Sequence, residues 1–478
     1  MAKRNILTPE ELKEFQDDKF PFENIAFEGG GGKGTAHIGA VRVLEEIGVW
    51  KNMKRFAGTS AGAMVAMCGA LGYDSHEMEA KMADGSSSKI YDAVLKHLTF
   101  LPHMLKYFGW NPGKEMEKFI GEVLAEKLGD ANATFEDLYN KTKRELCVVV
   151  SNVSQLDCLY CHVKTTPSMQ VKEAVRMSIS LPGVLYPVQH KGQYFVDGGL
   201  VNNFPIRVFD GWFLSMKPED NYLIRIPDLE DIAAAWDPNC QFGDQPNVKT
   251  VGVLLYSADE KEMFKDLLDK RAKEHVPDAT PLPNTKLARA RKKKEDKIDV
   301  ARKQHQDLVT TIAAFIKLLS NHTDVKKETI PKEALERALD QAGEEFTDEQ
   351  KAMVFGEGKS NADIVNAIDA NHDGQISMRE LTKFAETRGI EVRNVFRGFS
   401  STEITDLKGF FSAILDMVML SSKRVYFERY DVTRTIGVDT GYLGTLDLEM
   451  EDGDTDYMLK QGKRGCIAFL RYYKSQAE

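Results

Sequence analysis

The sequence has few cysteines and no long apolar run. Six cysteines are spread over 478 residues, which is too sparse for a disulfide scaffold. The first residues, MAKRNILTPEELKEF, contain no apolar stretch typical of a signal peptide. No apolar segment reaches the roughly 20 residues that span a bilayer. These absences exclude a disulfide-rich secreted protein and a membrane-spanning protein, and they predict a cytoplasmic location.

Basic residues are fewer than acidic residues. The chain has 63 Lys and Arg against 73 Asp and Glu, a formal net charge of −10. Such a chain has no general attraction to the phosphates of nucleic acid, so we expect no nucleic-acid partner. One basic run, Arg289–Lys294, could contact anionic lipid head groups, although acidic residues follow it directly.

The first half of the chain alternates short strands with helices. Asn24–Glu28 and Met53–Ala57 have the composition of buried strands, and Thr35–Ile47 has apolar residues at helical spacing. This alternation predicts an α/β fold with a mainly parallel sheet. Further strands are expected at Glu145–Ser151, Tyr194–Val196, Tyr222–Ile226 and Thr250–Tyr256.

A glycine-rich loop connects the first predicted strand to the first helix. Its sequence, FEGGGGKGT over Phe27–Thr35, lets backbone N–H groups turn toward an anion at a helix N-terminus. The loop also satisfies G-x-G-x-x-G, the dinucleotide-binding pattern. Lys54 and Arg55 stand near the position where that pattern expects an acidic residue, which weighs against a nucleotide-dependent oxidoreductase.

A serine turn follows the second predicted strand. The pentapeptide GTSAG matches G-x-S-x-G, in which Gly58 and Gly62 permit a strained turn that exposes the Ser60 hydroxyl. We predict that Ser60 is a nucleophile that attacks an acyl carbonyl. The negative oxygen formed in that attack needs preorganised donors. The candidates for this oxyanion hole are Gly30, Gly31, Gly32 and Lys33.

The serine needs a base, and Asp197 is the candidate. It ends a predicted strand and precedes two glycines that free the chain to turn the carboxylate inward. A D-G-G sequence alone is more typical of a simple turn. A Ser-His-Asp triad would need a histidine after the acid. Four histidines qualify by order, but all lie in a charged segment after residue 258: His275, His305, His322 and His372.

Taken in this order, the motifs GGGGKG, GTSAG and DGG resemble the patatin-like phospholipase family. The segments Ala174–Val188 and Asn202–Pro205 share the resemblance, which covers Phe22 to about Tyr256 and, more loosely, Arg424–Leu470. Glu28 departs from the Asp usual in plant members. The resemblance implies a three-layer α/β/α sandwich.

The resemblance also implies an activity and a mechanism. Ser60 would be the nucleophile and Asp197 its base in a dyad without histidine, and the glycine loop would be the oxyanion hole. The implied protein is a lipid acyl hydrolase of the phospholipase A2 or lysophospholipase class. Its substrate would be a phospholipid or another acyl lipid at a peripheral membrane surface, and the chemistry would require no cofactor.

The segment 259–404 is charged, helical in pattern and poor in aromatic residues. We therefore divide the chain into a first part of the catalytic domain (18–258), a helical insertion (259–404) and a return to the catalytic domain (405–475).

A calcium-type loop lies within the insertion. Residues 369–380 fit D-x-[DN]-x-[DN]-G-x₅-E at every defined position and resemble an EF-hand. EF-hands pair through their loops, yet no second complete loop is present. Residues 333–358 could be a degenerate partner, or two chains could pair in a homodimer. The predicted Ca²⁺ ligands are Asp369, Asn371, Asp373, Gln375, Ser377 and Glu380.

Two functions from different classes follow. In the first, the chain is a serine lipid hydrolase in which calcium has a regulatory or structural role. In the second, it is a calcium-binding module that interacts with lipid or protein, and its patatin-like domain is catalytically silent. The intact serine, aspartate and glycine loop favour the first.

Overall fold

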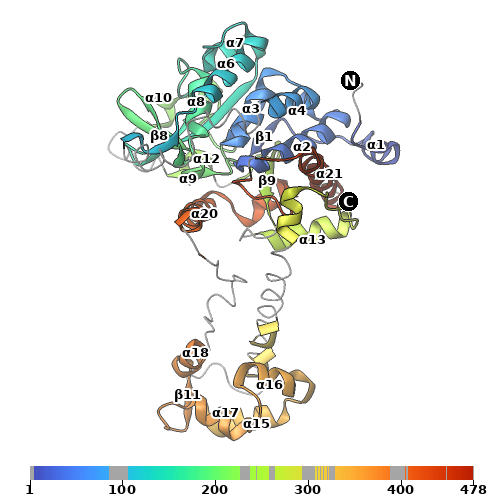
Figure 1. The fold of residues 1–478 in the computed structure, drawn as a ribbon, viewed down its shortest axis with the longest axis vertical. Helices are drawn as coiled ribbons and strands as arrows, with labels where there is room; N and C mark the ends of the chain where they lie inside the picture. The colour runs from blue at the N-terminus through green and yellow to red at the C-terminus, as the bar shows by residue number, and fades with distance from the viewer. Residues whose placement is uncertain are drawn as a thin grey trace. The chain divides into compact units, whose positions relative to one another are not determined.

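The computed structural model (Figure 1) divides the chain into two compact units, residues 1–289 with 406–478 and residues 290–405. The expected boundary after residue 258 differs, because α13 (Lys265–His275) belongs to the first unit. There, Arg271 donates hydrogen bonds to the carbonyl oxygens of Val432 and Thr435, each at 2.7 Å. The structure describes residues 5–84, 106–226, 237–243, 245–257, 264–292, 307–321 without 309, 313, 316 and 320, 329–387, 404, 407–447 and 449–476. Lys293, Lys294, His305 and His322 lie outside the described residues.

The first unit contains an eight-stranded mixed sheet. Its strands are β1 (Asn24–Phe27), β2 (Arg55–Thr59), β4 (Glu145–Asn152), β5 (Asp157–Cys161), β7 (Val188–His190), β8 (Gln193–Asp197), β9 (Thr250–Tyr256) and β12 (Thr435–Asp439). They follow the order β12-β9-β1-β2-β4-β8-β7, with β5 also paired to β4. The neighbours from β12 to β4 are parallel and the remaining pairs are antiparallel. The predicted α/β fold with a mainly parallel sheet is confirmed.

Both faces of this sheet are buried, in two separate apolar cores. Side chains alternate along the strands, so Ile25 and Phe27 pack into one core and Ala26 into the other. The first core is covered by helices, which are α2 (Thr35–Glu46), α3 (Ala61–Leu71), α6 (Lys114–Leu128), α8 (Val171–Ser178) and α21 (Asp452–Ser475). The second core is covered mainly by the non-helical segment 204–214 together with α13. One outer layer is therefore helical, whereas the other is largely non-helical.

Further elements complete the first unit. One prediction was wrong: Tyr222–Ile226 is not a strand, because the Asn221 side chain accepts the Leu223 N–H at 2.9 Å and caps a short helix. The remaining elements are α1 (Pro9–Phe15), α4 (Ser75–Asp84), α7 (Phe135–Thr142), α9 (Gly199–Asn202), α10 (Tyr222–Arg225), α12 (Pro238–Phe242), α20 (Leu407–Tyr426), β3 (Gly109–Asn111) and β6 (Gly183–Leu185).

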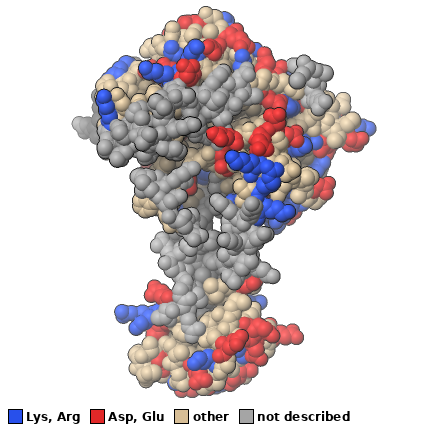
Figure 2. Space-filling view, viewed as in Figure 1, with Lys and Arg blue, Asp and Glu red and all other residues tan. Residues whose placement is uncertain are grey.

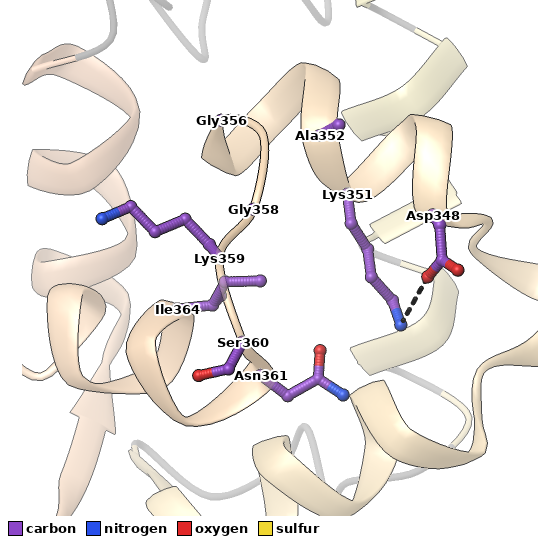
Figure 3. Close-up of a pocket in the computed structure, with 9 residues that line it drawn as sticks. All are labelled: Asp348, Lys351, Ala352, Gly356, Gly358, Lys359, Ser360, Asn361 and Ile364. Atoms are coloured by element: carbon purple, nitrogen blue, oxygen red, sulfur yellow. Dashed lines mark ion pairs between the residues drawn. The ribbon is translucent and has the colours of Figure 1, made fainter.

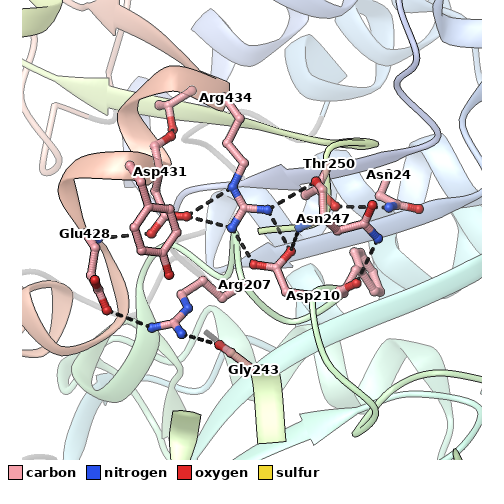
Figure 4. A network of polar contacts seen from close by, with 12 residues as sticks. Asn24, Arg207, Asp210, Gly243, Asn247, Thr250, Glu428, Asp431 and Arg434 are labelled. Carbon is pink, nitrogen blue, oxygen red and sulfur yellow. Dashed lines mark hydrogen bonds and ion pairs between the residues drawn. The ribbon is translucent and has the colours of Figure 1, made fainter. Parts of the chain in front are cut away.

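A buried polar network fastens the chain that follows the insertion to the chain that precedes it (Figure 4). Arg434 donates hydrogen bonds to Asp210 and Asp431, each with an oxygen at 2.6 Å. Arg207 reaches Glu428 at 3.3 Å. Buried charges are stable only when they are paired. The network therefore holds β12 and the residues just before it against the segment that contains Arg207 and Asp210.

The second unit is a small helical unit with its own core. Described residues between 307 and 321 are helical. They are followed by β10 (Thr329–Pro331), α15 (Lys332–Gln341), α16 (Asp348–Phe355), α17 (Asn361–Ile368), β11 (Gln375–Ser377) and α18 (Met378–Thr387). Its core includes Phe315, Phe346, Phe355 and Ile376. A pocket between α16 and α17 (Figure 3) is lined by the paired Asp348 and Lys351 and contains none of the predicted site residues.

The surface shows no strong bias of charge on the face drawn in Figure 2, where acidic and basic side chains are intermixed over the described residues. None of the described helices is both long and apolar enough to cross a membrane.

Candidate active site

The register of the sheet brings Ser60 and Asp197 together. Strand β5 occupies one edge of β4, so β2 and β8 share the other edge and run toward each other. Thr59 at the end of β2 is opposite Val149, and Asp197 at the end of β8 is opposite the next residue, Val150. The Ser60 hydroxyl donates a hydrogen bond of 2.7 Å to Oδ2 of Asp197. Two residues separated by 137 positions thus meet where two strands end.

Ser60 occupies a strained turn between β2 and α3. Its φ of 53° and ψ of −126° lie outside the usual regions for a residue with a side chain. The two glycines of the motif are required by packing. A Cβ on Gly58 would lie 2.2 Å from the Gly62 carbonyl oxygen, and one on Gly62 would lie 2.4 Å from the carbonyl oxygen of Phe27. The turn therefore presents the serine hydroxyl at the end of the sheet.

Asp197 is buried, with 3% of its surface exposed. Its Oδ1 accepts the Gly199 N–H at 2.8 Å, and its Oδ2 accepts the Ser60 hydroxyl. Burial raises the pKa of Asp197 to about 6, against the lowering effect of these hydrogen bonds. Within the described part of the chain, neither residue is hydrogen-bonded to a histidine. The arrangement can transfer a proton between Ser60 and Asp197 directly.

We expect kcat/KM for ester hydrolysis to rise with pH through about 6 and to level off above it. The raised pKa of Asp197 means that its carboxylate is available as a base only above that pH. The measurement is the initial rate of acid release from a soluble acyl ester, quantified by chromatography between about pH 5 and pH 8. A profile that stays flat across this range would argue against Asp197 as the base.

The glycine loop offers fewer free donors than the sequence suggests. The Gly32 amide donates to the carbonyl oxygen of Thr445 at 3.0 Å, and the Lys33 amide donates to that of Gly30 at 3.0 Å. These two members of the predicted oxyanion hole are therefore engaged. Among the described residues, no hydrogen-bond acceptor faces the amides of Gly30 and Gly31. These two N–H groups are the donors left to bind a negative oxygen.

Four residues that the motifs did not single out support the site. The Ser60 amide donates to the Ser178 hydroxyl at 2.9 Å. Asn203 binds the backbone of Gly29, next to the two free amides. Lys423 and Thr445 reach the glycine loop region from beyond the insertion. Ser178 and Asn203 lie in segments that carried the family resemblance, whereas no local pattern indicates Lys423 or Thr445.

The calcium-type loop lies in the second unit, between α17 and α18. Asp369 is 1% exposed, and its Oδ2 accepts the Gly374 N–H at 3.3 Å. Its Oδ1 is buried and has no hydrogen-bond partner in the described structure. Glu380 accepts the N–H groups of Ala370 at 3.1 Å and Ser377 at 3.0 Å. In the part of the chain that is described, no three His, Cys, Asp or Glu side chains converge as a metal cluster.

The remaining loop residues point to one another or to the loop backbone. Asn371 and Asp373 are joined at 2.8 Å, and Ser377 donates to Glu380 at 2.9 Å. Gln375–Ser377 forms β11, which pairs antiparallel with β10 at Thr329–Pro331. The partner of the loop thus precedes the expected segment 333–358, and it belongs to the same chain. The homodimer through paired loops stays a prediction.

The fold and the Ser60–Asp197 pair define a class, that of an α/β protein in which a serine hydroxyl donates a hydrogen bond to a buried carboxylate. The profile of the patatin-like phospholipase family matches residues 25–210, which include the glycine loop, Ser60 and Asp197. Residues 25–210 are therefore similar to the patatin-like phospholipase family.

Individual proteins and solved structures are also similar to this chain. The uncharacterized protein YqhO of Bacillus subtilis is 36% identical over 197 residues, 38% of this chain and 65% of YqhO. Lysophospholipase NTE1 of Mycosarcoma maydis is 22% identical over 204 residues, 42% of this chain and 10% of that protein. The structure of VipD from Legionella pneumophila is 14% identical, with a TM-score of 0.39, and the match covers 95% of this chain and 67% of VipD. That TM-score is too low to transfer any detail of the site.

Proposed function

We propose that the chain is a lipid acyl hydrolase of the phospholipase A type. The observation that carries the proposal is the 2.7 Å hydrogen bond from the Ser60 hydroxyl to the buried Asp197 carboxylate. The family match to residues 25–210 and the relative named as a lysophospholipase support a lipid ester as the substrate. Peripheral contact with a membrane surface follows from that substrate class.

The geometry supports a two-step mechanism. Ser60 Oγ attacks the ester carbonyl carbon while Asp197 takes its proton, and the negative oxygen accepts hydrogen bonds from the amides of Gly30 and Gly31. Collapse of the tetrahedral intermediate breaks the ester C–O bond, and Asp197 returns the proton to the leaving alcohol. Water then attacks the acyl-serine with Asp197 again as base; collapse of this second intermediate breaks the bond between the acyl carbon and Ser60 Oγ, and Asp197 returns the proton to Oγ. The products are a fatty acid and free Ser60.

We propose that the loop at 369–380 binds Ca²⁺ in a regulatory or structural role. The buried, unpartnered Oδ1 of Asp369 supports this, because a buried carboxylate oxygen without a partner is costly. Gly374 has a φ of +76° at the sharp turn that such loops require. The side-chain oxygens of Asp369, Asn371, Asp373 and Glu380 would hold the ion. The oxyanion donors of the first unit already supply the electrophilic part of the chemistry.

The test is fatty-acid release from vesicles of mixed-chain phospholipid across a titration of free calcium. We expect wild-type protein to release acid and Ser60→Ala to lose about 10⁴-fold or more in rate. Calcium should raise the rate, and Glu380→Gln should remove that rise. Glu386→Gln, an exposed change on the same helix, is the matched control and should keep it. A calcium response that survives Glu380→Gln would contradict the regulatory role.

The second candidate, a calcium-binding interaction module with a silent patatin-like domain, makes a different prediction for the serine. A fluorophosphonate reagent reacts with an activated serine and should label Ser60 in the wild type but not in Ser60→Ala. Failure to label Ser60 would favour this candidate over the hydrolase.

A further inference from the structure

A buried ion pair lies directly beside the glycine loop. Glu28 follows β1 and precedes the first glycine of the loop, and it is 2% exposed. Lys423 lies on α20, and 8% of its side chain is exposed. The Lys423 ammonium is paired with Oε1 of Glu28. One member of the pair thus comes from the first strand, and the other comes from the first helix after the insertion.

Glu28 is connected to the free amides of the loop through Asn203. Its Oε1 accepts the Asn203 Nδ2 group at 3.2 Å, and its Oε2 accepts the Leu255 N–H at 2.7 Å. Asn203 binds both backbone groups of Gly29. Its backbone carbonyl oxygen accepts the Gly29 N–H at 3.0 Å, and its side-chain Nδ2 donates to the Gly29 carbonyl oxygen at 3.0 Å. Gly29 immediately precedes Gly30, whose amide is one of the two available donors.

These hydrogen bonds require Glu28 to be ionised. The groups from Leu255, Asn203 and Lys423 all donate to its carboxylate. A carboxylate at this depth keeps its charge only when a cation compensates the loss of hydration. Removal of that cation would leave the buried Glu28 carboxylate uncompensated, which is strongly unfavourable. Asn203 and the start of the glycine loop would then have to move.

We propose that Lys423 is a positioning residue for the oxyanion hole, acting through Glu28 and Asn203. In this proposal, α20 contributes a residue that supports the active site. A second contact of α20 supports this role. Met419 of α20 lies beside Gly199, two residues after Asp197. This inference rests on the proposed hydrolase function.

The experiment compares Lys423→Met with Lys423→Arg and with Arg424→Met, which removes an exposed charge from the next position of the same helix. Two readouts are needed, kcat and KM on a soluble acyl ester and amide hydrogen exchange of the peptide containing residues 28–34. We expect Lys423→Met to lower kcat roughly 10- to 100-fold. KM should stay near the wild-type value, because the misplaced donors act on the transition state. Lys423→Arg should restore much of the rate, and Arg424→Met should leave it unchanged.

The exchange measurement separates positioning from general support of the fold. In Lys423→Met the loop amides should exchange faster while those of β4 keep their protection. Unchanged kcat and unchanged loop exchange would overturn the inference, and so would faster exchange throughout the first unit. If wild-type protein hydrolyses no ester, the proposed function fails. Loop exchange then decides alone whether Lys423 fixes the loop.

Discussion

Asp197→Asn is expected to abolish acyl release while making the fold more stable. The amide cannot accept the Ser60 proton, so kcat should fall by about 10⁴-fold or more, as expected when the base of an activated serine is removed. The loss should match that of Ser60→Ala, because the two residues act as one unit. The measurement is the single-turnover rate on an acyl ester. Asp157→Asn, an exposed change on β5, is the control.

The gain in stability follows from the direction of the pKa shift. Burial raises the pKa of Asp197 to about 6 from an ordinary value of 3.8, so folding favours the protonated form. Its charge is therefore unfavourable to the fold above pH 6, by about 3 kcal/mol for a shift of this size. This penalty fades as the pH falls from 6 toward 4. Urea denaturation should show Asp197→Asn as the more stable protein at pH 7.5 and nearly equal to wild type at about pH 4. A variant less stable than wild type at pH 7.5 would contradict the burial argument.

Gly31→Ala is expected to lower kcat by roughly 10²- to 10³-fold, the cost of losing an oxyanion donor. Gly31 has a φ of +52°, and a Cβ there would lie 2.2 Å from the carbonyl oxygen of Thr445. The loop or the Thr445 segment must therefore shift, and the Gly31 amide moves with it. Steady-state kinetics on a soluble acyl ester measures the effect.

A matched substitution separates this effect from backbone strain. Gly129 ends α6 with a φ of +77°, and a Cβ there would meet nothing within 4 Å. Gly129→Ala should destabilise the fold by about 1 kcal/mol through the same strain and leave kcat unchanged. Equal loss of activity in the two variants would show that strain, rather than the position of the Gly31 amide, is responsible.

Local patterns were sufficient for the parts of the site that are continuous in sequence. The strand, glycine loop and helix around Gly29–Thr35 and the turn at Ser60 each depend on neighbouring residues, so their spacing predicted them. That Ser60 meets Asp197 depends on register. Both strands must pair with one edge of β4 from opposite directions, which no local pattern contains. The prediction of this pairing came from the family resemblance.

The errors also have physical causes. The sequence places the Gly32 amide among the candidate oxyanion donors, and it cannot show that the amide donates to Thr445, because Thr445 comes from a distant segment. Tyr222–Ile226 has the composition of a strand, but the capping side chain of Asn221 starts a helix there. One of the two alternatives for the calcium-type loop is a degenerate partner at residues 333–358, whereas its partner strand begins at Thr329. A strand of three residues leaves too weak a period to be recognised.

The position of Thr445 and Lys423 near the C-terminal side of the chain has a consequence for protein synthesis. A ribosome produces Ser60, the glycine loop and Asp197 long before it produces the residues that hold the loop. A nascent chain therefore carries the proposed nucleophile before the residues that contact the glycine loop from the C-terminal side. The contacts of Lys423 with Glu28 and of Thr445 with Gly32 can form only after translation has passed the insertion.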